Sequence, residues 1–118
     1  MRFMTVADII RLLDATVICG AEYVQREVHN ACGSDMMSDV LAYVKDQSVL
    51  LTGLVNPQVV RTADMMDMVC VVFVRGKEPD DSMTQLAKER HIVLLKTNHR
   101  MFTACGILYF NGLSGGSD

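Results

Sequence analysis

The fold of this chain is decided by residues 49–76, which read VLLTGLVNPQVVRTADMMDMVCVVFVRG. The stretch opens with an apolar run that ends at a glycine turn and closes with a second apolar run, both of strand length. Between them, Asn56 is suited to cap a helix and Pro57 to occupy its first position, and the helix extends to about Met66. The stretch therefore predicts a strand, a helix and a second strand.

Two further units of the same kind follow along the chain. Residues 69–74 precede the turn Arg75-Gly76 and a helix from Ser82, for which Ser82 and Gln85 have capping-box spacing. Residues 92–95 precede the turn Thr97-Asn98 and a helix over residues 101–108. Apolar strands that alternate with helices predict an α/β fold of three layers, α/β/α, with a mainly parallel sheet and right-handed crossovers.

The N-terminal third is less regular. Thr5 and Asp8 have the spacing of a capping pair for a first helix, and residues 16–18 favour a short strand. Residues 22–32 fit either an edge strand or an extended crossing. Ser34 or Asp35 is the expected cap of another helix. Its predicted buried stripe consists of Met37, Val40, Leu41 and Val44.

The length of 118 residues suits one domain, predicted over residues 1–113, with residues 114–118 as a flexible tail. The net charge of -3 provides no basic field, so we expect no nucleic-acid partner. No apolar stretch reaches the roughly 18 residues that span a membrane, so we expect no membrane partner. The four cysteines form no CxxC pair and follow no secretory leader, which favours the cytoplasm.

Catalytic and metal-binding patterns are weak. The sequence contains no P-loop, no GxGxxG and no GxSxG motif. The four cysteines are 13, 38 and 35 positions apart, which argues against an iron–sulfur cluster within one subunit. We therefore expect no catalytic residue, no metal and no cofactor. Two alternatives remain open, a nucleophilic Cys105 near His99 and a cluster shared between subunits.

Candidate ligand-binding residues follow the predicted strands. In parallel sheets ligands gather beyond the carboxyl ends of the strands, where helix N-termini offer N–H groups to anions. Three such turns predict a site for a phosphate or carboxylate ligand. Its candidate residues are Thr52, Gly53, Asn56, Arg75, Gly76 and Thr97.

Four segments carry a resemblance to a known family: residues 31–35 (ACGSD), 51–58 (LTGLVNPQ), 61–63 (RTA) and 73–76 (FVRG). With residues 92–97 and 101–106, they resemble the DRTGG domain family, especially its small stand-alone members. The resemblance implies an α/β/α fold similar to the N-terminal domain of HPr kinase/phosphorylase, without the kinase chemistry.

The resemblance also implies a biological setting. DRTGG domains occur beside CBS domains in regulated pyrophosphatases and inside some phosphotransacetylases, where they look like regulatory or dimerisation modules. Stand-alone members are often encoded near iron hydrogenase subunits, and some are described as iron–sulfur-binding. The resemblance supplies no catalytic residue.

We therefore expect a non-catalytic regulatory or ligand-sensing module that binds a small anionic metabolite or nucleotide. An enzyme partner such as hydrogenase subunits is implied by the resemblance. The alternative is an accessory iron–sulfur or electron-transfer protein of a hydrogenase system. We also expect a homodimer, because the adjacent methionines at 36–37 and 65–66 cannot all face the sheet. Met36 or Met65 would then lie in the dimer contact.

Overall fold

A computed structural model describes residues 3–44 and 47–116 of the chain. Its strands are β1 (Met4–Thr5), β2 (Thr16–Cys19), β3 (Glu27–Val28), β4 (Asn30–Gly33), β5 (Ser48–Thr52), β6 (Cys70–Phe73) and β7 (Val93–Lys96). Its helices are α1 (Val6–Leu13), α2 (Met37–Tyr43), α3 (Pro57–Met65), α4 (Asp81–Glu89) and α5 (Met101–Phe110), with a short 3-10 turn, η1, at Ala21–Tyr23. Residues 117–118 of the predicted tail lie outside the described residues.

The central sheet has the strand order β2-β7-β6-β5-β4. Strands β4 to β7 are parallel, and β2 pairs antiparallel to β7 at one edge. Each strand from β4 to β7 lies beside the next in the chain. Right-handed crossovers that advance in one direction place α2, α3 and α4 on the same face.

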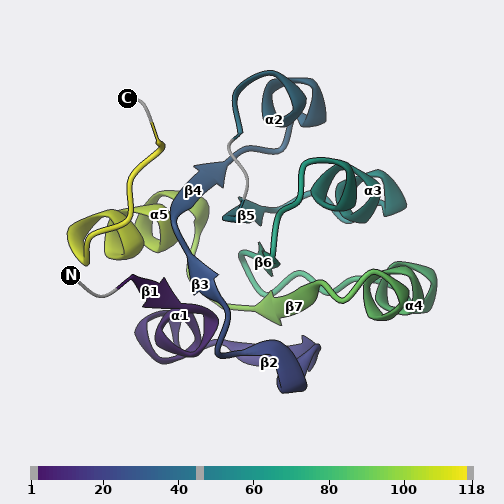
Figure 1. Cartoon of the computed structure of the whole chain (residues 1–118), viewed down its shortest axis with the longest axis horizontal. Coiled ribbons are helices and arrows are strands. Elements are labelled where there is room, and N and C mark those ends of the chain that lie inside the picture. The colour runs from purple at the N-terminus through teal and green to yellow at the C-terminus, as the bar shows by residue number, and fades with distance from the viewer. Residues whose placement is uncertain (1–2, 45–46, 117–118) are drawn as a thin grey trace.

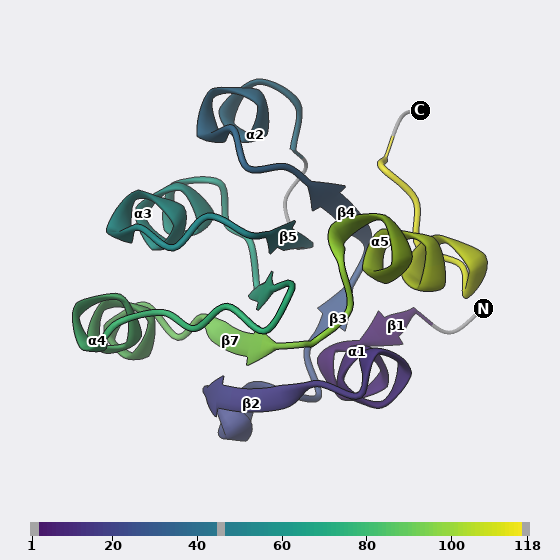
Figure 2. The ribbon, with the colours of Figure 1, turned by 180° about the vertical axis from the view of Figure 1, so that it is seen from behind.

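The helices complete three layers, as the sequence predicts (Figures 1 and 2). One core lies between the sheet and α1 with α5, and includes Ile9, Leu51 and Leu108. The other lies between the sheet and α2, α3 and α4, and includes Val60 and Met83. Strands β5 and β6 are buried along their whole length, which is why they read as unbroken apolar runs.

Residues 22–32, for which the sequence fits either an edge strand or an extended crossing, contain both. After β2, the chain crosses from one edge of the sheet to the other, as the blue ribbon in Figure 1 shows. On the way, β3 pairs antiparallel with β1, and the chain then forms the edge strand β4. Both readings of residues 22–32 are therefore partly correct.

The predicted helix starts differ in accuracy. The capping box of α1 is confirmed, with Thr5 N donating to Asp8 at 2.9 Å and Asp8 N to the Thr5 hydroxyl at 3.2 Å. The Ser82 cap is wrong, because the carboxylate of Asp80 accepts from Met83 N at 2.9 Å and α4 begins at Asp81. Two good capping residues stand two positions apart, and local pattern alone does not choose between them.

The cap of α2 is also wrong. Its N-cap is Met36, without a side-chain hydrogen bond, while Ser34 and Asp35 lie in the preceding loop. Of the predicted stripe, Met37 and Val40 are buried, Val44 is partly buried, and Leu41 is exposed.

Candidate functional site

The candidate site lies where β5 and β6 end side by side. Thr52 is the last residue of β5 and pairs in register with Phe73 of β6, so Gly53 and Arg75 follow at the same end of the sheet. Arg75 and Gly76 have left-handed backbones, with φ of 59° and 67°. Their N–H groups donate to His99 O and Thr97 O, both at 2.8 Å. The turn after β6 is therefore fixed to the turn after β7.

This geometry brings Arg75 onto Gly53. A Cβ atom added to Gly53 would lie 2.4 Å from a terminal guanidinium nitrogen of Arg75, closer than any real Cβ contact. Because glycine has no Cβ atom, the arginine can lie against the backbone of Gly53, and a larger residue there would displace the guanidinium from this position. The two residues that strand-end reasoning placed on separate turns thus form one surface.

A residue that the sequence analysis assigned to a helix cap completes this surface. The carboxylate of Asp35 accepts from Gly53 N at 2.7 Å and from the Thr52 hydroxyl at 3.0 Å. The N–H group of Gly53, one of the predicted ligand-binding residues, is therefore occupied by a carboxylate from the same chain. Asp35 ends the ACGSD segment of the family resemblance, but the sequence analysis did not include it among the ligand-binding candidates.

Asn56 and Pro57 begin α3 as predicted. The Asn56 side chain accepts from Gln58 N at 2.7 Å, and Val59 N donates to Asn56 O at 2.9 Å. Proline has no N–H group. The first turn of α3 therefore has its donors satisfied within the chain, and Asn56 acts on the site by fixing where α3 begins.

Thr97 is buried and its hydroxyl is directed into the protein. It donates to Leu13 O at the end of α1 at 2.7 Å and accepts from His99 N at 3.3 Å. Gly76 lies against the Asn98 side chain, whose Oδ1 would be 3.0 Å from an added Cβ. Thr97 and Gly76 thus shape the turns, and Arg75 supplies the exposed charge.

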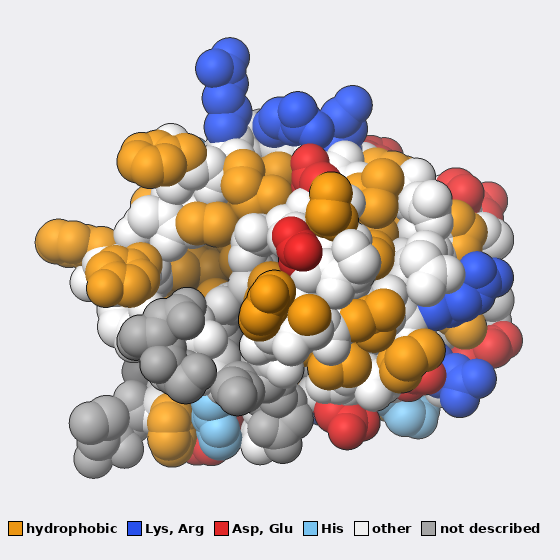
Figure 3. All heavy atoms as spheres, turned by 90° about the horizontal axis from the view of Figure 1, so that it is seen from above, with side chains coloured by type: hydrophobic (Ala, Val, Ile, Leu, Met, Phe, Trp, Pro, Cys, Tyr) orange, Lys and Arg blue, Asp and Glu red, His pale blue; other side chains and the backbone are white. Residues whose placement is uncertain are grey.

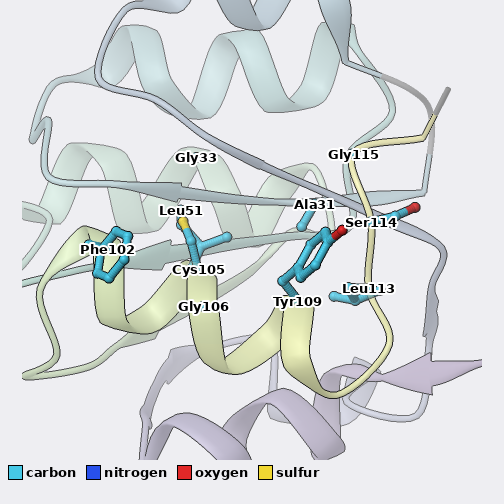
Figure 4. Close-up of a pocket in the computed structure, with 10 residues that line it drawn as sticks. All are labelled: Ala31, Gly33, Leu51, Phe102, Cys105, Gly106, Tyr109, Leu113, Ser114 and Gly115. Atoms are coloured by element: carbon cyan, nitrogen blue, oxygen red, sulfur yellow. The ribbon is translucent and has the colours of Figure 1, made fainter. Parts of the chain in front are cut away.

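A separate hollow lies on the face of the sheet that α1 and α5 cover. It is a groove of about 320 Å³ between α5, β4 and the segment after α5. Figure 4 shows Phe102 at one end and Ser114 towards the other, with Cys105 and Tyr109 between them. The remaining lining residues include Ala31, Gly33, Leu51 and Leu113, so the groove is mostly apolar.

The cysteines are spread across the fold. Cys19 and Cys32 lie on the two edge strands β2 and β4, Cys70 is buried in β6, and Cys105 lies on α5. Burial raises the pKa of each thiol, and for Cys105 the neighbouring Cys32 adds to the effect. Neutral thiols are weak nucleophiles and poor metal ligands. Within residues 3–44 and 47–116, no three His, Cys, Asp or Glu side chains converge on a point suited to a metal.

This dispersion predicts a colourless protein. Chain purified without oxygen should show no absorption band near 400 nm and should contain less than one iron per chain, because no cluster has enough converging thiolates. Iron analysis and a visible spectrum test this. Several irons per chain with a visible band that is lost in Cys32→Ala would contradict it.

Among the helices of residues 3–44 and 47–116, none has the length and apolar character that a membrane span requires.

The chain is similar to known proteins in both sequence and fold. The DRTGG domain model matches residues 8–109. A solved structure of the CBS and DRTGG domains of the regulatory region of Clostridium perfringens pyrophosphatase, complexed with the activator diadenosine tetraphosphate, has the same fold, with a TM-score of 0.73 at 16% identity. The match covers 88% of this chain but 45% of that one, so this chain spans less than half of its length. No curated protein sequence matches.

Proposed function

The chain belongs to the DRTGG domain family, and we propose that it is a non-catalytic regulatory module that senses a small anionic ligand and works as a homodimer. Its ligand-binding surface comprises Thr52, Gly53 and Arg75, with Asn56, Gly76 and Thr97 positioning the turns around them. The enzyme that it regulates binds elsewhere on the module, and hydrogenase subunits are candidates for it.

The observation that carries this proposal is the placement of Arg75. The guanidinium of the exposed Arg75 lies beside Gly53 at the neighbouring strand end, on a turn with two consecutive left-handed residues. Left-handed backbone at a non-glycine residue costs free energy and is frequent where a side chain must point at a ligand. A guanidinium recognises phosphate and carboxylate oxygens through paired N–H donors.

The ligand class follows from the charges at the site. Arg75 favours an anion, whereas Asp35 already holds the Gly53 N–H and repels a second negative charge. The ligand therefore reaches Arg75 from the solvent side and does not replace Asp35. A phosphate-bearing metabolite, such as a nucleotide, fits because its phosphate can bind Arg75 while the rest of the molecule extends over the turns.

The state of the cysteines supports a role without catalysis. The alternative nucleophile, Cys105, has its sulfur against Met101 Sδ at 3.7 Å and would contact a Cβ at Gly33 at 2.6 Å. Burial raises the pKa of its thiol, so it is protonated at neutral pH. A packed, neutral thiol fits a structural role on α5.

Binding can be tested with defined probes. Diadenosine tetraphosphate, ATP and inorganic phosphate are titrated into the whole chain by calorimetry, and the melting temperature is followed in parallel. A ligand that binds the native state raises the melting temperature. We expect Arg75→Ala to weaken binding about tenfold, the loss of one charge-assisted contact, with unchanged circular dichroism.

The matched control is Arg11→Ala, which removes an exposed arginine from α1 on the other face of the sheet. It should leave the affinity unchanged. Equal affinity in Arg75→Ala, or an equal loss in both variants, would refute the assigned site. If none of the probes binds the wild-type chain, the ligand-sensing proposal is wrong for phosphate ligands.

A further inference from the structure

The outer face of α5 is apolar and exposed. The helix reads MFTACGILYF and contains no charged residue. The exposed fractions are 89% for Phe102, 75% for Tyr109 and 89% for Phe110. Figure 3 shows hydrophobic side chains protruding on the left, the side on which Figure 1 places α5. Large aromatic rings in such a position mark a surface that another molecule covers.

These rings form one continuous stripe. Phe102, Gly106, Tyr109 and Phe110 stand at positions i, i+4, i+7 and i+8, which lie on one face of a helix. Gly106 is in the middle, and a Cβ added there would meet nothing within 4 Å. The stripe therefore has a low centre with aromatic rings on both sides, and Phe102 and Tyr109 also border the groove beside β4 (Figure 4).

The exposed area is large enough to matter for association. Each aromatic side chain presents about 150–250 Å², so three rings at these exposures offer on the order of 450 Å². A stable interface buries about 800 Å² on each partner. The rings would supply more than half of that area, and the groove walls and the neighbouring parts of α5 supply the rest.

We infer that α5 is the dimer contact, in which the α5 helices of two copies of this chain cross at Gly106. This inference rests on the homodimer in the proposed function and names its interface. A twofold contact requires a surface that is complementary to itself. This stripe has protruding rings and a hollow on the same helix, so Phe102 or Phe110 of one copy can enter the groove of the other.

The charge of the chain does not oppose a second copy as the occupant of this surface. The chain carries a net charge of -3, so two copies repel each other unless the contact itself is neutral. The stripe on α5 is neutral. Met36 and Met65 are also exposed, but Met36 precedes the first residue of α2 and Met65 is the last residue of α3, so they lie at opposite ends of two helices that run in the same direction and do not form one continuous apolar surface. The exposed methionines that the sequence predicts are present, but α5 is the better contact.

The test measures the mass of the whole chain between 1 and 100 µM by light scattering and sedimentation. The wild type should have twice the monomer mass of 13.1 kDa. Phe102→Glu and Phe110→Glu should each raise the dimer dissociation constant at least about 100-fold, because a symmetric contact loses the residue twice. Met65→Glu is the matched control, an exposed apolar residue on another helix, and should change it less than about threefold.

Gly106→Leu provides a second, independent readout. Leucine has a higher helix propensity than glycine and space is open at this position, so the folded monomer should be at least as stable as before. The dimer should nevertheless weaken, because the helices can no longer approach closely. A variant that unfolds is identified by circular dichroism and is replaced by Gly106→Ala, for which the same opposite shifts are expected on a smaller scale.

The outcomes separate the inference from the proposed function. If the wild type is a dimer that Met65→Glu dissociates and the α5 variants do not, the dimer stands and the α5 interface is wrong. If the wild type is monomeric over the whole range, the homodimer and its interface are both wrong, while ligand binding at Arg75 is unaffected. Dissociation only by the α5 variants supports the inference.

Discussion

Thr97→Val should lower the free energy of unfolding by about 2 kcal/mol, because a buried hydrogen bond between distant parts of the chain is lost. The Thr97 hydroxyl donates to Leu13 O at 2.7 Å, across 84 positions of sequence. Valine has nearly the same shape but no donor, so a carbonyl at the end of α1 is left without its partner. His99 N also loses an acceptor at 3.3 Å.

Urea denaturation with two spectroscopic probes measures this effect. Thr97→Ser keeps the hydroxyl and should recover most of the stability, which separates the hydrogen bond from side-chain packing. The affinity of folded Thr97→Val for phosphate ligands should stay within about twofold of wild type, since the Thr97 carbonyl still accepts from Gly76 N. An unchanged stability with a lost affinity would instead place the hydroxyl in contact with the ligand.

The three layers and the mainly parallel sheet could be predicted from sequence because burial dictates them, whereas the strand order was not predicted. Strands buried on both faces must be apolar throughout, as β5 and β6 are. Connections between parallel strands are right-handed, and this places α2, α3 and α4 on the same face of the sheet. These constraints act over whole elements, so errors at single positions do not disturb them.

The helix starts and the crossing segment were less accessible, because single contacts decide them. Asp35 has the chemistry of an N-cap, but the N–H of Gly53, 18 positions away, binds its carboxylate instead. Asp80 and Ser82 compete for one helix start, and the side chain of Ser82 itself donates to Asp80. Strand β3 has two residues, too few to show any periodicity.

In the candidate site, the positions of the residues could be predicted from sequence, but their hydrogen-bond partners could not. Strand ends in a parallel sheet meet at one edge, which is why Thr52, Gly53 and Arg75 could be grouped in advance. Whether each group is free for a ligand depends on its partners within the chain. Asp35 holds the Gly53 N–H, and Leu13 holds the Thr97 hydroxyl. Of the six predicted residues, Arg75 is both charged and exposed. The carboxylate of Asp35 lies close to it and repels an anion that binds there.

Asp35→Ala is therefore the variant whose effects on stability and affinity should have opposite signs. Removing the carboxylate takes away the acceptor of Gly53 N and of the Thr52 hydroxyl, and Thr52 is fully buried. We expect the free energy of unfolding to fall by about 1.5 kcal/mol, the lower range for hydrogen bonds to a charged group, because water reaches Gly53 N. Circular dichroism should still show a folded chain at 25 °C.

The affinity of this variant for phosphate ligands should rise about tenfold. The Asp35 carboxylate and the Arg75 guanidinium both lie against Gly53, so a phosphate bound to Arg75 is within several ångströms of a like charge. Removing a charge at that distance near a protein surface is worth about 1.4 kcal/mol, and the Gly53 N–H becomes available to an anion oxygen.

Asp39→Ala, which removes an exposed carboxylate from the first turn of α2, is the matched control and should change affinity less than about twofold. Calorimetry with inorganic phosphate and ATP at two salt concentrations measures both variants. The gain should shrink at high salt, because screening weakens the repulsion that is removed. Weaker binding in Asp35→Ala would mean that the carboxylate holds the ligand itself, and the site would then favour a cationic or hydroxyl-bearing molecule.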